Sequence, residues 1–134
     1  MRVHSDSMEF DTRGEFDLVD LTAKVENAVE GFGIREGIAI VYAGHATGVI
    51  VLNEYEPRLL EDLKEFLLSL IPAECGYRHP SNAHAHLMSM LLTPSRVIPV
   101  HGGHLGLGTW QSLYWVEVER RPRRRRVEVT VIGE

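Results

Sequence analysis

Strand-like segments that follow one another without a helix between them constrain the fold of this chain most strongly. Val127, Val129 and Val131 alternate with polar residues, which is the period of a half-exposed strand. Apolar residues recur at helical spacing clearly in only two segments, 17–31 and 57–70. Strands adjacent along the chain form antiparallel sheets, whereas parallel strands need a long crossover. The sequence therefore predicts an α+β fold, a mostly antiparallel curved β-sandwich or open barrel with two to three helices.

The expected elements are short and end at glycine, proline or small polar residues. Strands are expected at residues 8–12, 37–43, 48–53 and 95–101 and around 127–131, and residues 105–119 are expected to form one long strand or a pair of strands. In the first helical segment Asp20 or Thr22 can cap the helix. The second is expected to run from Pro57 to Leu70 and to stop at Pro72. No linker or internal repeat interrupts the pattern, so residues 1–134 are expected to form one domain.

Composition and charge exclude several classes of protein. The 134 residues are 44% hydrophobic and 25% charged, which is typical of a globular domain. No apolar run approaches the roughly 20 residues of a membrane-spanning helix, and the N-terminus, where His4 is expected to be disordered, has no signal-peptide pattern. Cys75 is the single cysteine, so we expect a cytoplasmic protein without an internal disulfide. The net charge of −5 argues against nucleic acid as a partner. The composition and the shortness of the apolar runs argue against a membrane.

Six arginines crowd the segment 120–126 around Pro122. One interpretation is a solvated hairpin tip between two strands. The other is that one or two of these side chains bind a phosphate, because a guanidinium group matches the geometry of phosphate oxygens. The residues alone leave both interpretations open.

A polar cluster at residues 79–86 contains three histidines and an asparagine. If this segment is helical, His79, Asn82 and His86 share a face at positions i, i+3 and i+7, and His84 points elsewhere. The apolar residues that follow continue at helical spacing, which favours the helix. We therefore predict a functional role for His79 and His86, whereas His84 could equally be a ligand or a structural residue.

A second polar group, His45 and Thr47, follows a β-rich run, and Glu54 ends the next expected strand. A carboxylate on an adjacent strand can orient an imidazole or complete a metal site. Three imidazoles, from His45, His79 and His86, together with an oxygen ligand would suit zinc with one open position. The same groups could hold a phosphate without a metal. Their spacing does not choose between these two kinds of site.

The segment 108–111 places a glycine and a threonine before a tryptophan and a glutamine. It lacks the lysine and the following helix of a nucleotide-phosphate loop. Gly108 would allow close approach of the backbone, and Thr109 and Gln111 provide hydrogen-bonding groups. Trp110 either packs in the core or forms a wall for a flat heteroaromatic ring.

The order of these motifs resembles the YjbQ-like family, small proteins associated with a secondary thiamine-phosphate synthase activity. The resemblance runs nearly end to end and is carried by residues 19–22, 45–47, 53–54, 79–86, 98–100 and 108–111. This chain departs from the family at Ala46, where the family usually has a threonine, and at 120–124, where the family usually has a glycine before the arginines.

The resemblance implies a compact β-rich fold that assembles as a homotrimer. It also implies a transferase reaction that joins hydroxymethylpyrimidine diphosphate to a thiazole phosphate and releases pyrophosphate. Two other functions remain open: a trimeric protein that binds a small phosphorylated metabolite, and a hydrolase that depends on a metal held by histidines.

The resemblance and the residues together give one set of candidates. The predicted catalytic residues are His45, Glu54, His79 and His86. The predicted substrate-binding residues are Thr47, Asn82, Gly108, Thr109, Trp110 and Gln111. His45, His79 and His86 are the expected ligands of any resident metal. The candidate cofactors are Mg²⁺ bound with the diphosphate and Zn²⁺ at the histidines.

Overall fold

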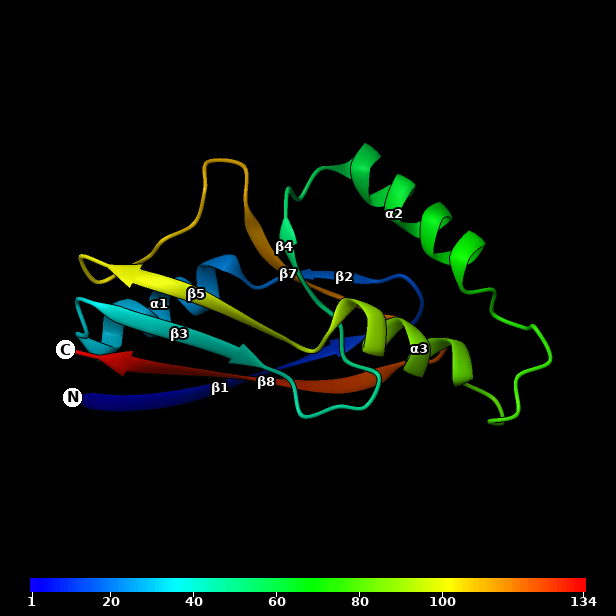
Figure 1. Ribbon diagram of the computed structural model, residues 1–134, viewed down its shortest axis with the longest axis horizontal. Coiled ribbons are helices and arrows are strands. Elements are labelled where there is room, and N and C mark those ends of the chain that lie inside the picture. Colours follow the sequence, from blue (N-terminus) through cyan, green and yellow to red (C-terminus); the bar gives the residue numbers. More distant parts are fainter.

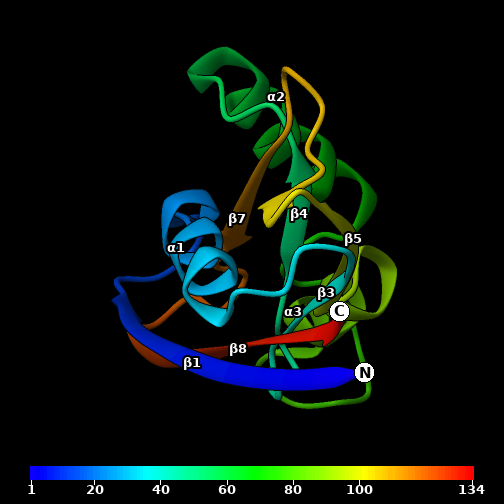
Figure 2. The same cartoon turned by 90° about the vertical axis from the view of Figure 1, so that its left-hand side faces the viewer.

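The computed structural model describes residues 1–134 as two antiparallel β-sheets with three helices (Figure 1). The larger sheet is made of β1 (Arg2–Thr12), β3 (Gly37–Tyr42), β5 (Ser95–His101), β6 (His104–Leu105) and β8 (Arg123–Gly133). The strand order in this sheet is β1-β8-β3-β5-β6. β1 and β8 pair along their full length, and Figure 2 shows the two strands curving together.

The smaller sheet is made of β2 (Leu18–Asp20), β4 (Ile50–Asn53) and β7 (Ser112–Val116). Its strand order is β2-β7-β4, and all pairings in both sheets are antiparallel. The predicted α+β class with curved, mostly antiparallel sheets is therefore confirmed. This prediction rested on strand-like segments that follow one another along the chain, because short connections favour antiparallel neighbours.

Helix α1 (Thr22–Phe32) packs its apolar face into the main core. Val25 and Val29 lie one helical turn apart and are fully buried. They belong to a cluster of 17 buried apolar residues that includes Trp115 of β7 and side chains from the larger sheet. Gly33, in the left-handed conformation with φ of 71°, ends the helix.

Helix α2 (Pro57–Leu70) has the bounds that its sequence predicts. Glu56 caps its start, because the side chain accepts a hydrogen bond of 2.7 Å from the backbone N–H of Leu59. Leu67 is the only fully buried residue of this helix, which lies beyond β4 at the upper right of Figure 1. None of the three helices is both long and apolar enough to cross a membrane.

Helix α3 (Ala83–Leu92) contains the last two histidines of the polar cluster. The segment is thus helical from Ala83, as expected, but Asn82 is the N-cap, so His79 lies before the helix. Ser89 Oγ donates a hydrogen bond of 2.6 Å to the carbonyl of Gly48. This contact holds the middle of α3 against the loop that leaves β3.

The segment 105–119 takes the form of a pair of strands, β6 and β7, because residues 106–111 form a loop in which Gln111 Oε1 accepts the N–H of Gly108. Two local expectations were wrong. Residues 123–126 belong to β8, so the arginine run is mostly strand and not a hairpin tip. His4 is part of β1, where its ring stacks on Phe32 with centroids 5.6 Å apart.

Candidate functional site

Three of the predicted site residues come together at the start of α3. The rings of His79 and His86 are nearly perpendicular, and their centroids are 4.8 Å apart. Nε2 of His79 lies 3.2 Å from Oδ1 of Asn82. His79 precedes the helix, while Asn82 and His86 are separated by about one turn and present side chains to the same side. These contacts put two imidazoles and one amide within reach of a common ligand.

His84 has entirely different surroundings from His86. Its side chain is only 1% exposed, and Nε2 lies 3.2 Å from a carboxylate oxygen of Glu15. The other ring nitrogen, Nδ1, has no hydrogen-bond partner. His84 is therefore a buried residue held by Glu15, and it points away from the contact between His79 and His86.

His45 lies in the loop after β3 and is held by β8. Its Nε2 accepts a hydrogen bond of 3.0 Å from the backbone N–H of Arg126, so the neutral ring carries its proton on Nδ1. Burial lowers the pKa of His45, and the charges of Arg125 and Arg123 lower it further. The ring meets Trp115 edge-on with centroids 6.1 Å apart. His45 is thus a neutral imidazole on the border of a cationic region.

Glu54 does not reach His45 within one chain. Its carbonyl accepts a hydrogen bond of 3.3 Å from Tyr114, and its N–H donates to the side chain of Asn53. The carboxylate has no hydrogen bond or ion pair. Thr47, by contrast, is buried and accepts a hydrogen bond of 3.2 Å from Arg125.

The centre of the site is a buried ion pair that the sequence interpretation missed. Arg125 donates to both carboxylate oxygens of Glu117, through Nε at 2.7 Å and Nη2 at 2.5 Å. Both side chains are almost completely buried. Thr12 Oγ1 donates a further hydrogen bond of 2.7 Å to Glu117, and the guanidinium group lies over the ring of Trp115 at 4.9 Å. The arginine is thus fixed by a planar partner on its edge and an aromatic ring on its face.

The local environment decides the charge of Glu117. Burial alone would raise the pKa of this carboxyl group, because it disfavours the charged form. Hydrogen bonds from Arg125, Thr12 and the backbone of Glu119 outweigh burial, so the pKa lies below its ordinary value. Glu117 is therefore a carboxylate at neutral pH.

Hydrogen bonds connect this ion pair to the histidines of the polar cluster. The backbone N–H of Glu119 donates to Glu117 at 2.9 Å, and Asn82 Nδ2 donates to Glu119 at 2.6 Å. Asn82 then contacts His79. At the other end, Arg125 adjoins Thr47, and the next residue of β8 holds His45. The predicted histidines thus lie at two ends of one polar network whose middle is Glu117 and Arg125.

A signal for Arg125 was present in the sequence. The alternation of Val127, Val129 and Val131 extends back to position 125, so this arginine occupies an inward-facing position of the strand. Arg124 and Arg126 face solvent. Glu117 gave no comparable signal, because it follows the end of β7 and its inward orientation depends on the bend of the chain there.

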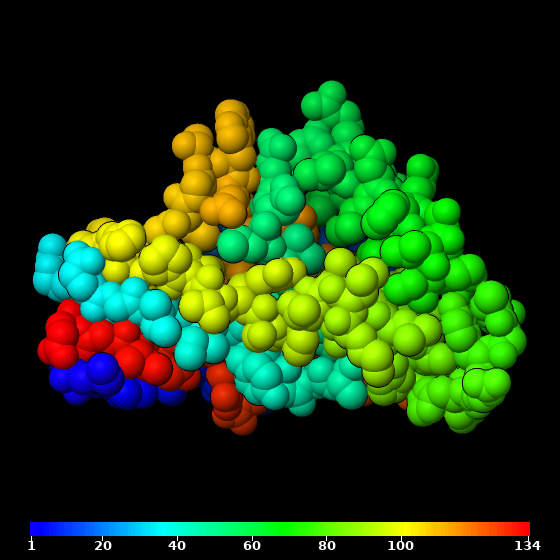
Figure 3. Space-filling model, in the orientation of Figure 1, coloured from blue at the N-terminus to red at the C-terminus, as the bar shows by residue number.

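The segment Gly108–Gln111 forms the tip of the loop between β6 and β7. Figure 3 shows this loop, in orange, standing out from the rest of the molecule. The side-chain oxygen of Gln111 accepts a hydrogen bond of 2.8 Å from the N–H of Gly108, which stabilises the turn. Trp110 is 74% exposed, so it does not pack in the core of its own chain.

No cluster of His45, His79 and His86 that could coordinate a metal forms within the chain. The group of three potential ligands that does form contains Glu26, Glu30 and His104, whose ligand atoms lie within 4.8 Å of one another. His104 already interacts with both carboxylates, at 3.4 and 3.2 Å. Zinc at the three predicted histidines therefore does not fit the residues of a single chain.

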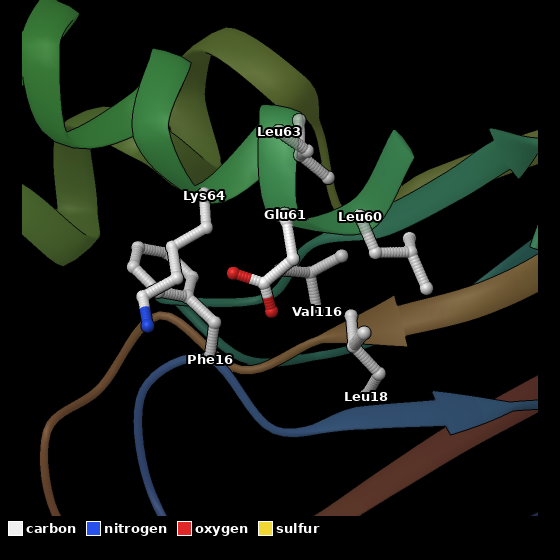
Figure 4. A pocket seen from close by; sticks show the side chains of 7 residues that line it. All are labelled: Phe16, Leu18, Leu60, Glu61, Leu63, Lys64 and Val116. Carbon is white, nitrogen blue, oxygen red and sulfur yellow. The ribbon is translucent and has the colours of Figure 1, made fainter. Parts of the chain in front are cut away.

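The cavities of the molecule differ sharply in character. One of about 90 Å³ lies under α2 and is mostly apolar, with Glu61 and Lys64 beside it (Figure 4). It contains none of the predicted site residues. His45 and Arg126 line a separate hollow, and a third, lined only by polar or charged residues, adjoins the start of α3.

The fold and this network define a small α+β protein in which two antiparallel sheets position histidines around a buried arginine–carboxylate pair. Residues 6–134 match the family described as "UPF0047 protein YjbQ-like". The chain belongs to this family, as the order of its motifs predicted. A UPF0047 protein of Methanothermobacter thermautotrophicus is 38% identical over 100% of this chain and 95% of its own length. One from Archaeoglobus fulgidus is 44% identical over 90% of this chain and 95% of its own length.

Solved structures of similar proteins support the same assignment. A crystal structure of a YbjQ-like protein of unknown function from Sulfolobus solfataricus superposes with a TM-score of 0.95 at 37% identity and covers 99% of both chains. A YjbQ/UPF0047 family protein from Clostridium acetobutylicum gives a TM-score of 0.89 at 32% identity, over 95% of this chain and 99% of that one.

Proposed function

We propose that this protein is a transferase that joins hydroxymethylpyrimidine diphosphate to a thiazole phosphate. In this reaction the bond between the pyrimidine methylene carbon and the diphosphate oxygen breaks. A bond from the thiazole nitrogen to that carbon forms, and pyrophosphate leaves. Membership of the YjbQ-like family supports this substrate class. The observation on which the proposal rests is the contact of His79, Asn82 and His86 at the start of α3, which brings two imidazoles and an amide together.

The main barrier of such a transfer is the departure of the diphosphate, because negative charge grows on the leaving oxygen. Preorganised cations lower this barrier most effectively when they are shielded from water. Mg²⁺ entering with the diphosphate would supply such a positive charge. His79 and His86 can donate a proton to a leaving oxygen, which is typically worth about 10²–10⁴ in rate. Neutral His45 can hold the aminopyrimidine or the thiazole by a hydrogen bond from Nδ1.

The proposed functional unit is a homotrimer, and exposed apolar side chains support this assembly. On α3 and the start of β5, Leu87, Met90, Leu91 and Val97 are exposed. On α2, Phe66 and Leu70 are more than half exposed. Exposed apolar groups of this size commonly mark a protein interface. In a trimer, the loop that carries Trp110 would lie near a neighbour's histidines, where the indole would form a wall for a flat ring.

The direct test is product formation from the two thiamine precursors in the presence of Mg²⁺, measured for the wild type and for His86→Ala. The variant should lose about 10²–10⁴ in rate if the ring supplies a proton. His101→Ala is the matched control, because His101 is an exposed histidine that pairs with Glu36 on another part of the molecule. Both variants must show the thermal unfolding of the wild type.

Two outcomes would contradict the transferase. Absence of product from wild-type protein, together with saturable binding of either precursor, would favour the binding protein for a phosphorylated metabolite. Stoichiometric zinc in purified protein, with hydrolysis of phosphate esters, would favour the metal-dependent hydrolase. Equal activity of His86→Ala and wild type would remove the histidines from the chemistry.

A further inference from the structure

A polar hollow of about 290 Å³ lies where α3 begins. It is lined by Ser81, Asn82, His84, Glu119, Arg120 and Arg121, and none of these side chains is apolar. The first three come from the start of α3, and the other three come from the connection between β7 and β8. A hollow of this size and polarity is suited to a small, strongly polar ligand.

The start of α3 offers unused hydrogen-bond donors on this side. The side chain of Asn82 makes no capping hydrogen bond, because its Oδ1, the atom that would accept one, contacts Nε2 of His79 instead. The backbone N–H groups of Ala83 and His84 have no acceptor, whereas those of Ala85 and the next residue reach the carbonyl of Asn82. Free amides at the start of a helix carry a partial positive charge and attract anions.

His84 gives a second, independent indication of a ligand. It lines the hollow, is 1% exposed, and has an Nδ1 atom without a partner. A buried polar atom left unpaired costs on the order of 1–3 kcal/mol, so such atoms are rare unless a ligand or water satisfies them. Nε2 is already held by Glu15. Because the Glu15 carboxylate accepts from Nε2–H, Nδ1 is an acceptor in the neutral ring and a donor in the protonated ring. A monohydrogen phosphate has both an O–H donor and acceptor oxygens, so it can pair with either form.

The charges around the hollow favour an anion. Arg121 is exposed and has no ion pair or hydrogen bond in the structure. Arg120 pairs with Glu74 at 3.4 Å, but both side chains are largely exposed, and such pairs exchange at little cost. The one carboxylate of the hollow, Glu119, already accepts a hydrogen bond of 2.6 Å from Asn82. Two guanidinium groups therefore face one occupied carboxylate.

We infer that this hollow binds the phosphate group of a small ligand. Its donors are the free amides of Ala83 and His84 and the guanidinium groups of Arg120 and Arg121, and Nδ1 of neutral His84 accepts from the O–H of the phosphate. This site is distinct from Arg125, which does not line the hollow and whose Nε and Nη2 donate to Glu117 and Thr47. The inference goes beyond the proposed synthase activity and does not depend on it.

The test is calorimetric titration of the full-length protein with inorganic phosphate and, separately, with pyrophosphate. We expect saturable binding by the wild type and at least about tenfold weaker binding by the double variant Arg120→Gln/Arg121→Gln, because each guanidinium group donates charge-assisted hydrogen bonds. Arg124→Gln is the matched control. It removes one charge from the same arginine run, but Arg124 lies on the exposed face of β8 and pairs with Glu9 and Asp11.

Amide chemical shifts locate the bound anion without relying on the variants. Added phosphate should shift the ¹⁵N–¹H signals of Ala83 and His84 more than those of the amides at the start of α1. Sulfate, which has no O–H donor at neutral pH, should bind more weakly than phosphate. Equal binding by the double variant and the wild type, shifts elsewhere, or no saturable binding would each overturn the inference.

The phosphate-binding test and the synthase assay can fail independently of each other. Phosphate binding that responds to Arg120 and Arg121 in a protein without synthase activity would leave this site in place and remove the transferase. Synthase activity together with no phosphate binding at Ala83 and His84 would support the transferase and remove this site.

Discussion

Arg125 of β8 and Glu117, just beyond β7, form a bidentate ion pair in the interior of the protein, with N–O distances of 2.7 and 2.5 Å. Neither side chain has appreciable exposure. Two charges removed from water are stable only when each satisfies the other. The pair also joins the strand that holds His45 to the hydrogen-bonded path that reaches His79. Its integrity therefore matters both for stability and for the position of the histidines.

Arg125→Met should destabilise the protein strongly, because it leaves the carboxylate of Glu117 buried and unpaired. Loss of one partner of a buried ion pair typically costs about 3–5 kcal/mol. The free energy of unfolding in urea, at fixed protein concentration, measures this loss. Arg124→Met on the exposed face of the same strand is the control and should have little effect. The double variant Glu117→Gln/Arg125→Met should recover part of the loss, because no uncompensated charge remains. Equal stability of Arg125→Met and Arg124→Met would contradict this account.

Glu117 also predicts how stability depends on pH. Its pKa is lower in the folded protein than in the unfolded chain, so between these two values the unfolded state binds more protons. The stabilisation from this group is therefore complete above the ordinary glutamate value of about 4.3 and is lost as the pH falls through the folded value. Urea denaturation at a series of pH values down to about pH 3 should show this decline. In Glu117→Gln the decline should be shallower, and an identical slope would refute the role assigned to this carboxylate.

The sequence predicted the elements whose pattern is local. Helix α2 was predicted to the residue, because Pro57 and Pro72 bound a regular apolar face. Strand β5 was also predicted to the residue. The family resemblance was likewise confirmed, since short motifs in a fixed order carry more information than any one of them.

The centre of the site was not predicted, because it depends on contacts between residues far apart in the sequence. An arginine run next to a proline has the composition of an exposed turn, and this obscures the inward-facing position that the alternation of Val127, Val129 and Val131 gives to Arg125. The partner, Glu117, is buried because Thr12 of β1 and Trp115 enclose it. A sequence pattern gives a side chain's orientation within a strand, but it does not give the partner across the fold.

His84 and His86 provide a second comparison, since they lie on one helix with different surroundings. His84→Ala should lower the thermal stability, because it removes a buried side chain and its contact with Glu15. His86→Ala should unfold close to the wild-type temperature, because its ring is only partly buried and contacts mainly the exposed His79. Differential scanning calorimetry of both variants measures the difference. If His86→Ala were the less stable variant, the contact of His84 with Glu15 would not be an important stabilising interaction.

Trp110 distinguishes the single chain from the proposed trimer. Within one chain its indole is 74% exposed, whereas Trp115, the other tryptophan, is fully buried. If a neighbouring subunit covers Trp110, acrylamide should quench the fluorescence of the wild type only weakly. Trp110→Phe should then change little the fraction of tryptophan fluorescence that acrylamide can quench. Trp110→Ala should leave the far-UV circular dichroism unchanged, because the indole makes no contribution to the core, but it should weaken assembly as measured by light scattering. A wild-type mass near 15.1 kDa with a readily quenched Trp110 would rule out both the trimer and a binding wall supplied by a neighbour.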